Sequence, residues 1–147
     1  MKKGFSLLEI LIALAVTALV AVVISITLSR FGASQQLSQA REEVLSLLSE
    51  ARSLTLASRA EMQHGVHFES DRAVFFAGTT YNASDPQNKT YTIPPSVSLS
   101  WSITGGDDVI FLRLTGETIH TGTITFTSLK SGDISTLTIY GTGTIEE

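Results

Sequence analysis

The chain has 147 residues, a formal net charge of −4 and no cysteine. Its length supports one globular domain, and the missing cysteines exclude disulfides and thiolate metal sites. The surplus of acidic residues disfavours nucleic-acid binding, which needs clustered lysine and arginine side chains.

An uncharged, mostly apolar run of 20 residues extends from Ile10 to Ser29, after a short segment that holds Lys2 and Lys3. As a helix this run is about 30 Å long, enough to cross the hydrocarbon core of a bilayer. The two lysines favour a cytoplasmic N-terminus, with the rest of the chain on the other side of the membrane.

Glu9 is the unusual residue of this N-terminal region, because it places a carboxylate at the edge of an apolar span. An ionisable group in such a position is a functional candidate, and it needs a partner. If the chain were cut after Gly4, the new amine of Phe5 would lie one helical turn from Glu9. That pair could form within one chain or between neighbouring chains.

The segment Lys3-Gly-Phe-Ser-Leu-Leu-Glu9, followed by a long apolar helix, closely resembles the class III signal of type IV pilins and type II secretion pseudopilins. The resemblance implies cleavage by a prepilin peptidase between Gly4 and Phe5, and N-methylation of Phe5. It places Glu9 where the family has the glutamate that docks a subunit on its neighbour. The implied partners are other pilin or pseudopilin subunits, the peptidase, an inner-membrane assembly platform, and membrane lipid before assembly.

Two other interpretations of the N-terminus compete with this one. A secretory signal peptide could be cut at the small residues of Ala13-Leu14-Ala15, although Glu9 would interrupt its apolar core. A plain single-pass anchor would need only the length of the apolar run. Neither alternative explains why Gly-Phe precedes Glu9 at this spacing.

The helix is expected to continue beyond the apolar run as an amphipathic helix. Apolar residues recur at intervals of mostly three and four, and no proline occurs between Phe5 and Ser58, so we predict one helix of about 54 residues. Gly32 is its weakest point. The apolar stripe comprises Leu37, Ala40, Val44, Leu47, Leu48, Ala51 and Leu54.

The rest of the chain alternates between apolar and polar residues, which predicts β-strands. The expected fold class is α+β, with a long N-terminal helix packed on an antiparallel β-sheet module, as in pilins. The expected parts are a leader (1–4), a transmembrane or filament-core helix (5–29), an amphipathic continuation (30–60) and a β-rich globular domain (61–147). The expected strands are 66–69, 73–76, 91–93, 97–103, 109–114, 119–127, 134–140 and 144–145.

The order of motifs in the domain resembles the pseudopilin H and FimT-like minor pilin branch of the family. The shared features are Glu50-Ala51-Arg52, Gly65-Val66-His67-Phe68, Ile110-Phe111 with Gly116, and Thr138 to Ile145. This resemblance implies two small sheets against the helix. Members of the branch often have an arginine after the glycine near the C-terminus, where this chain has Thr142 after Gly141.

The sequence offers no constellation for catalysis, so we expect no enzyme, no cofactor and no metal site. His64 and His67 would lie on opposite faces of a strand, and His120 is isolated. A calcium site built from Asp107, Asp108 and Asp133 is left open, although aspartate is common at turns for local backbone bonding.

We therefore expect a structural subunit, a minor pilin or a pseudopilin, in the inner membrane of a bacterium and then in a filament outside it. The alternatives are a minor pilin that binds DNA during uptake, or a plain membrane-anchored or secreted β-domain. DNA binding is disfavoured because Lys130 is the only lysine or arginine after Arg113.

Overall fold

One continuous helix forms the axis of the molecule. The computed structural model describes residues 6–57 and 62–147, with the backbone alone for residues 26–30. Helix α1 (Leu7–Leu56) is 50 residues long, about 75 Å at the standard rise. It passes through Gly32 without a break, which confirms the prediction of one helix. The predicted end near Ser58 itself lies outside the described residues. In the described part α1 ends at Leu56, and Ala57 caps it by donating to the carbonyl of Ser53 at 2.9 Å.

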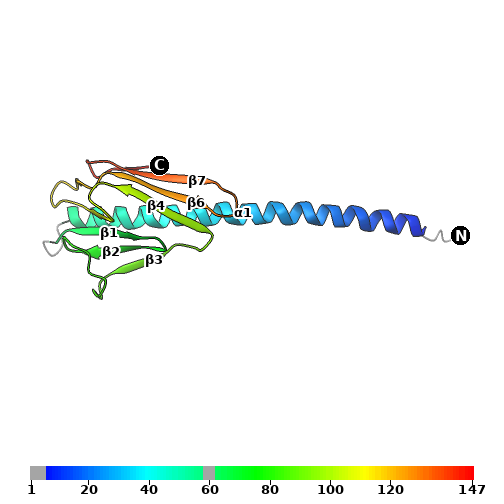
Figure 1. The fold of residues 1–147 in the computed structure, drawn as a ribbon, viewed down its shortest axis with the longest axis horizontal. Helices are drawn as coiled ribbons and strands as arrows, with labels where there is room; N and C mark the ends of the chain where they lie inside the picture. The colour runs from blue at the N-terminus through cyan, green and yellow to red at the C-terminus, as the bar shows by residue number, and fades with distance from the viewer. Residues whose placement is uncertain (1–5, 58–61) are drawn as a thin grey trace.

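The two halves of α1 have different surroundings, as Figure 1 shows. The first half extends away from the rest of the chain, whereas the second half lies along the β-strands. The buried residues of the second half follow the spacing of one helix face, so the predicted apolar stripe is confirmed as core packing. Leu47 and Leu54 are only partly buried at its edge. The fully packed members are Ala33, Leu37, Ala40, Val44, Leu48 and Ala51.

Two antiparallel four-stranded sheets pack against the second half of α1 (Figure 1). This arrangement confirms the predicted α+β layout. The first sheet has the order β3-β2-β1-β5, and the second has the order β4-β6-β7-β8. The strands are β1 (His64–Glu69), β2 (Arg72–Ala77), β3 (Lys89–Thr92), β4 (Val97–Ile103), β5 (Asp108–Ile110), β6 (Gly122–Ser128), β7 (Ile134–Ile139) and β8 (Ile145–Glu146).

The alternation of apolar residues decides which face of each strand packs on the helix. In β4, Val97 and Leu99 are buried, while the alternating Ser98, Ser100 and Ser102 are exposed. In β1, Val66 and Phe68 are buried against α1 from the same face of the strand. The sheets and the helix therefore share one core, whose largest fully buried side chains include Phe68, Phe111, Phe126 and Leu48.

Two strand predictions were wrong by three or more residues at one end, while the others agree to within two residues at each end. The strand expected over 109–114 ends at Ile110, and the strand expected over 119–127 begins only at Gly122. The chain turns back on itself between them, because the N–H of Leu112 donates to the carbonyl of Glu117 at 2.7 Å. The hydroxyl of Thr118 also donates to the carbonyl of Ile110 at 2.8 Å, so this carbonyl is already bonded where the strand stops.

Candidate functional site

Glu9 lies in the first turn of α1. The backbone N–H groups of Glu9 and Ile10 both donate to the carbonyl of Ser6, at 3.0 and 3.3 Å, which starts the helix at this point. A carboxylate in a first turn interacts favourably with the positive end of the helix dipole. Gly4 and Phe5, the predicted cleavage site, lie outside the described residues.

The surroundings of Glu9 are apolar and open. Glu9 lines a shallow surface depression together with Ile10, Ala13, Leu14 and Thr17. The hydroxyl of Thr17 donates to the carbonyl of Leu14 at 3.0 Å, so the helix itself satisfies this donor. Within the described part of the chain, the Glu9 carboxylate has no hydrogen-bond or ion-pair partner.

The apolar residues of Leu7–Ser25 in α1 are all exposed. Residues Leu7–Ser25 have a mean hydropathy of 2.9, none of them is buried, and their length and composition suit a membrane span. Soluble proteins rarely expose an apolar surface of this size, because water around it is unfavourable. This surface needs lipid or other apolar helices around it.

Polar contacts tie α1 to β3, to the C-terminal residue and to two loops of the globular domain. Lys89 of β3 pairs with Glu50, and Arg41 pairs with Glu147 at 2.9 Å. Arg52 is the central connection, because its Nε donates to the carbonyl of Gly116 at 3.2 Å and its Nη2 donates to the carbonyl of Thr142 at 3.3 Å. The sequence showed Arg52 only as part of a resembling motif, since its backbone partners are 64 and 90 residues away.

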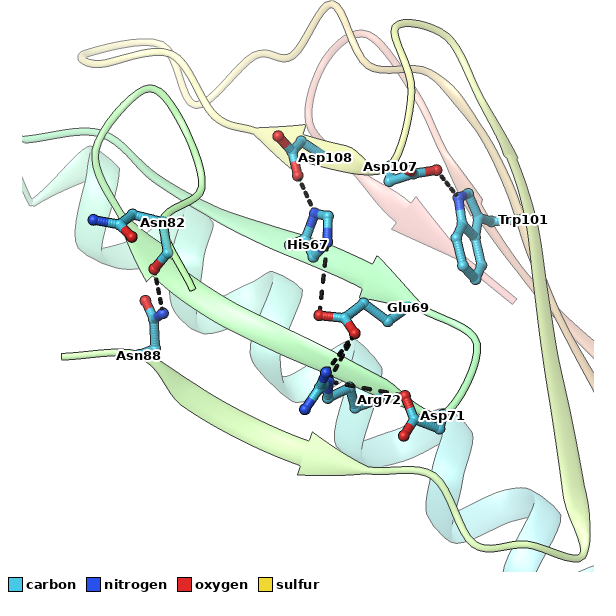
Figure 2. Close-up of polar contacts among 9 residues, drawn as sticks. All are labelled: His67, Glu69, Asp71, Arg72, Asn82, Asn88, Trp101, Asp107 and Asp108. Carbon is cyan, nitrogen blue, oxygen red and sulfur yellow. Dashed lines mark hydrogen bonds and ion pairs between the residues drawn. The ribbon is translucent and has the colours of Figure 1, made fainter. Parts of the chain in front are cut away.

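A second polar cluster surrounds His67 on the outer face of β1 (Figure 2). The Nδ1 of His67 lies 2.5 Å from Asp108 Oδ1, and its ring stacks on Tyr81 with a centroid distance of 4.0 Å. On the same face Glu69 accepts two hydrogen bonds from Arg72, and these lower the pKa of the Glu69 carboxyl. These contacts hold β1, β2 and β5 together.

The other two histidines have separate surroundings. His64 faces α1, where Thr55 Oγ1 accepts its backbone N–H at 2.9 Å, and burial lowers the pKa of its imidazole. His64 and His67 thus lie on opposite faces of β1, as predicted. His120 contacts the carbonyl of Thr104 at 3.2 Å.

Asp107, Asp108 and Asp133, the three aspartates considered for a calcium site, do not form one cluster. Asp107 accepts a hydrogen bond from Trp101 Nε1 at 2.8 Å, and Asp108 bonds His67, as Figure 2 shows. Asp133 accepts from the hydroxyl of Ser131 at 2.6 Å, in the turn between β6 and β7. Among the residues that the structure describes, no group of three or more histidine, aspartate or glutamate side chains could hold a metal ion.

The similarity of this chain to known proteins is found in its N-terminal segment. A family model described as the prokaryotic N-terminal methylation motif matches residues 1–25. These 25 residues are similar to the N-terminal segment of type IV pilin-like proteins. The motif indicates a substrate of a prepilin peptidase, and the single apolar helix fits a membrane-anchored protein of this kind. No curated protein and no solved structure gave a significant match to the chain.

Proposed function

We propose that this chain is a structural subunit, a minor pilin or a pseudopilin, of a type IV pilus or a type II secretion pseudopilus. The observation that carries the proposal is the methylation motif at the start of a helix in which the apolar span Leu7–Ser25 has no buried residue. A filament core of packed helices would cover that surface after lipid has been left behind.

Processing would come first. A prepilin peptidase would cut between Gly4 and Phe5 and methylate the new amine, which removes Lys2 and Lys3 from the subunit. Before the cut these lysines favour a cytoplasmic N-terminus, so the globular domain stands outside the membrane. The amine of Phe5 would then lie about 6 Å along the helix axis from Glu9.

Glu9 would set the register of assembly. A carboxylate surrounded by apolar helices is costly unless a cation neutralises it, so its cost falls when it meets the N-terminal amine of a neighbour. An assembly platform would draw the helix out of the bilayer, and packing against other helices would replace the lost lipid contacts. The ties from Arg52 and Glu50 to the globular domain support this step, since they would move the domain with the helix.

The test compares the full-length chain with its Glu9→Val and Glu9→Asp variants, expressed beside a prepilin peptidase and an assembly platform. We expect mature protein that begins at a methylated Phe5 in all three, by mass spectrometry. Filaments that sediment after shearing should be lost with valine and partly kept with aspartate, whose carboxylate is one methylene shorter. Protein isolated from the cells that still begins at Met1 would contradict the proposal, as would normal filament assembly by the Glu9→Val variant.

A Gly4→Trp variant separates the two steps. A bulky residue before the cut should block the peptidase, so this variant should keep the mass of the uncut chain and remain in the membrane. An unchanged mature mass in Gly4→Trp would count against cleavage at this bond.

A further inference from the structure

A groove on the globular domain lies between the last turns of α1 and the segment that leads into β8. We propose that this groove binds the carboxyl-terminal residue of an extended peptide, with its carboxylate on Arg52 and an apolar side chain between Leu45 and Ile145. The groove has a volume of about 360 Å³, which is within the range of small-ligand sites. Its lining residues are Leu45, Ser49, Arg52, Ser53, Leu56, Gly143, Thr144 and Ile145.

Arg52 brings a positive charge without a counter-ion to this groove. Its side chain is partly buried, and its Nε and Nη2 donate to the neutral carbonyls of Gly116 and Thr142. In the described part of the chain no carboxylate forms an ion pair with Arg52, whereas Arg41 on the same helix pairs with Glu147 at 2.9 Å. Burial of a charge is costly unless a group of opposite sign pairs with it. The groove therefore favours an anion at Arg52, where Nη1 is not used by either carbonyl.

Two serine hydroxyls stand beside this charge. Ser49 and Ser53 are one helical turn apart, so both face the groove from α1. Within the described residues neither hydroxyl has a hydrogen-bond partner, and both side chains are exposed. A carboxylate has two acceptor oxygens, so it can bind the guanidinium and a hydroxyl together. One unpaired cation balances one negative charge, and the net charge of −4 disfavours an anion of higher charge, which selects a carboxylate over a phosphate dianion.

The rest of the groove suits an apolar side chain and a peptide backbone. Leu45 and Ile145 are partly buried at the edge of the core, and Leu56 is 40% exposed. Strand β8 pairs with β7 alone, so it is an edge strand of its sheet. An edge strand offers backbone donors and acceptors to an extended chain. A peptide that ends in an apolar residue matches the cation, the apolar walls and the strand edge at once.

This inference goes beyond the proposed function, because the groove belongs to the globular domain and is far from Glu9 in the sequence. Binding of a peptide needs neither cleavage after Gly4 nor assembly of a filament. A peptide that fails to bind would therefore leave the proposed function untouched, and loss of filaments in Glu9→Val would leave the groove untouched.

Calorimetric titration of the full-length chain in detergent micelles, with empty micelles as the blank, tests the ligand. The probe is N-acetyl-Ala-Ala-Leu with a free carboxylate. The same peptide with a C-terminal amide, and N-acetyl-Ala-Ala-Gly with a free carboxylate, should each bind about tenfold more weakly or worse. Hexanoate lacks the peptide backbone and inorganic phosphate lacks the apolar part, so both should also bind more weakly than the probe. No binding of the probe at millimolar concentration, or equal binding of the probe and any of these four compounds, would overturn the proposal.

A carboxylate built into the groove tests the position. Ser49→Asp places a carboxylate three residues before Arg52 on the same helix, so it should compete with the peptide and weaken its binding about tenfold. Ser46→Asp is the matched control, because it makes the same change at an exposed position of α1 that does not line the groove. It should leave binding within about twofold. Both variants should keep the circular dichroism of the parent chain, since both serines are exposed. Equal losses in the two variants, or no loss in Ser49→Asp, would refute the assignment to this groove.

Discussion

Arg52 Nε donates a hydrogen bond to the backbone carbonyl of Gly116 across 64 residues of sequence, at 3.2 Å. The same guanidinium also reaches the carbonyl of Thr142. One side chain of α1 thus joins the helix to the loop 111–121, which follows β5, and to the closing segment of the chain. In this closing segment Thr142 follows Gly141, and the backbone of Thr142 is held by an arginine from the helix.

Replacing Arg52 with alanine should destabilise the domain by about 1–3 kcal/mol, because two charged hydrogen bonds are lost and two carbonyls lose their partner. Thermal unfolding of the full-length chain in detergent, followed by circular dichroism, measures this change. Arg113→Ala is the control, since Arg113 is exposed and the change should stay within about 0.5 kcal/mol. Equal effects of the two variants would contradict a connecting role for Arg52.

Gly143 should not tolerate a side chain. It has a φ of 74°, and an added Cβ would lie 1.8 Å from the carbonyl oxygen of Gly116. We therefore expect Gly143→Ala to cost more than about 1 kcal/mol, through both strain and collision.

Gly132→Ala separates these two causes. Gly132 has nearly the same φ, 76°, but no atom lies within 4 Å of its added Cβ. Its alanine variant should show only the backbone strain of about 1 kcal/mol. The measurement is the difference in unfolding free energy between the two variants, and a larger loss for Gly132→Ala would refute the steric explanation.

Replacing Gly32 with alanine should have the opposite effect on stability. It lies inside α1, and no atom is found within 4 Å of an added Cβ. Gly32→Ala should therefore raise helix stability by about 1 kcal/mol. Hydrogen exchange of the amides around residue 32 measures this, and slower exchange is expected. Loss of assembly with a stabilised helix would show that filament formation needs bending at this position.

His64 should make the stability of the domain depend on pH. Burial lowers its pKa in the folded chain below the usual value, while the nearby Glu50 partly opposes this shift. The unfolded chain therefore binds a proton at a higher pH than the folded chain does. Stability from this group is complete above the ordinary histidine pKa of about 6.5 and is lost as the pH falls through it.

A His64→Gln variant should lose less stability than the parent chain between pH 7.5 and pH 5.5. Thermal unfolding at both pH values measures the difference, and His120→Gln serves as the control because His120 has a more exposed setting. If His64→Gln and the parent chain lose the same stability over this interval, burial of His64 is not the cause.

The sequence by itself determined the features that depend on local order along the chain. The motif around Phe5 and Glu9 is carried by a family resemblance, and the apolar span by its length and lack of charge. The helical stripe follows from spacing, since a helix places residues three and four apart on one face. The alternating serines of residues 97–103 determined β4 in the same way. These local patterns also established the α+β layout before any contact was known.

Only the tertiary structure decided which distant groups meet. It ended β5 at Ile110, because the bonds of Leu112 and Thr118 fold the following segment into a loop that alternation cannot reveal. It separated Asp133 from Asp107 and Asp108, and it brought Arg52 to Gly116. Such contacts depend on how two sheets settle on one helix, and backbone carbonyls accept hydrogen bonds without leaving any mark in the sequence.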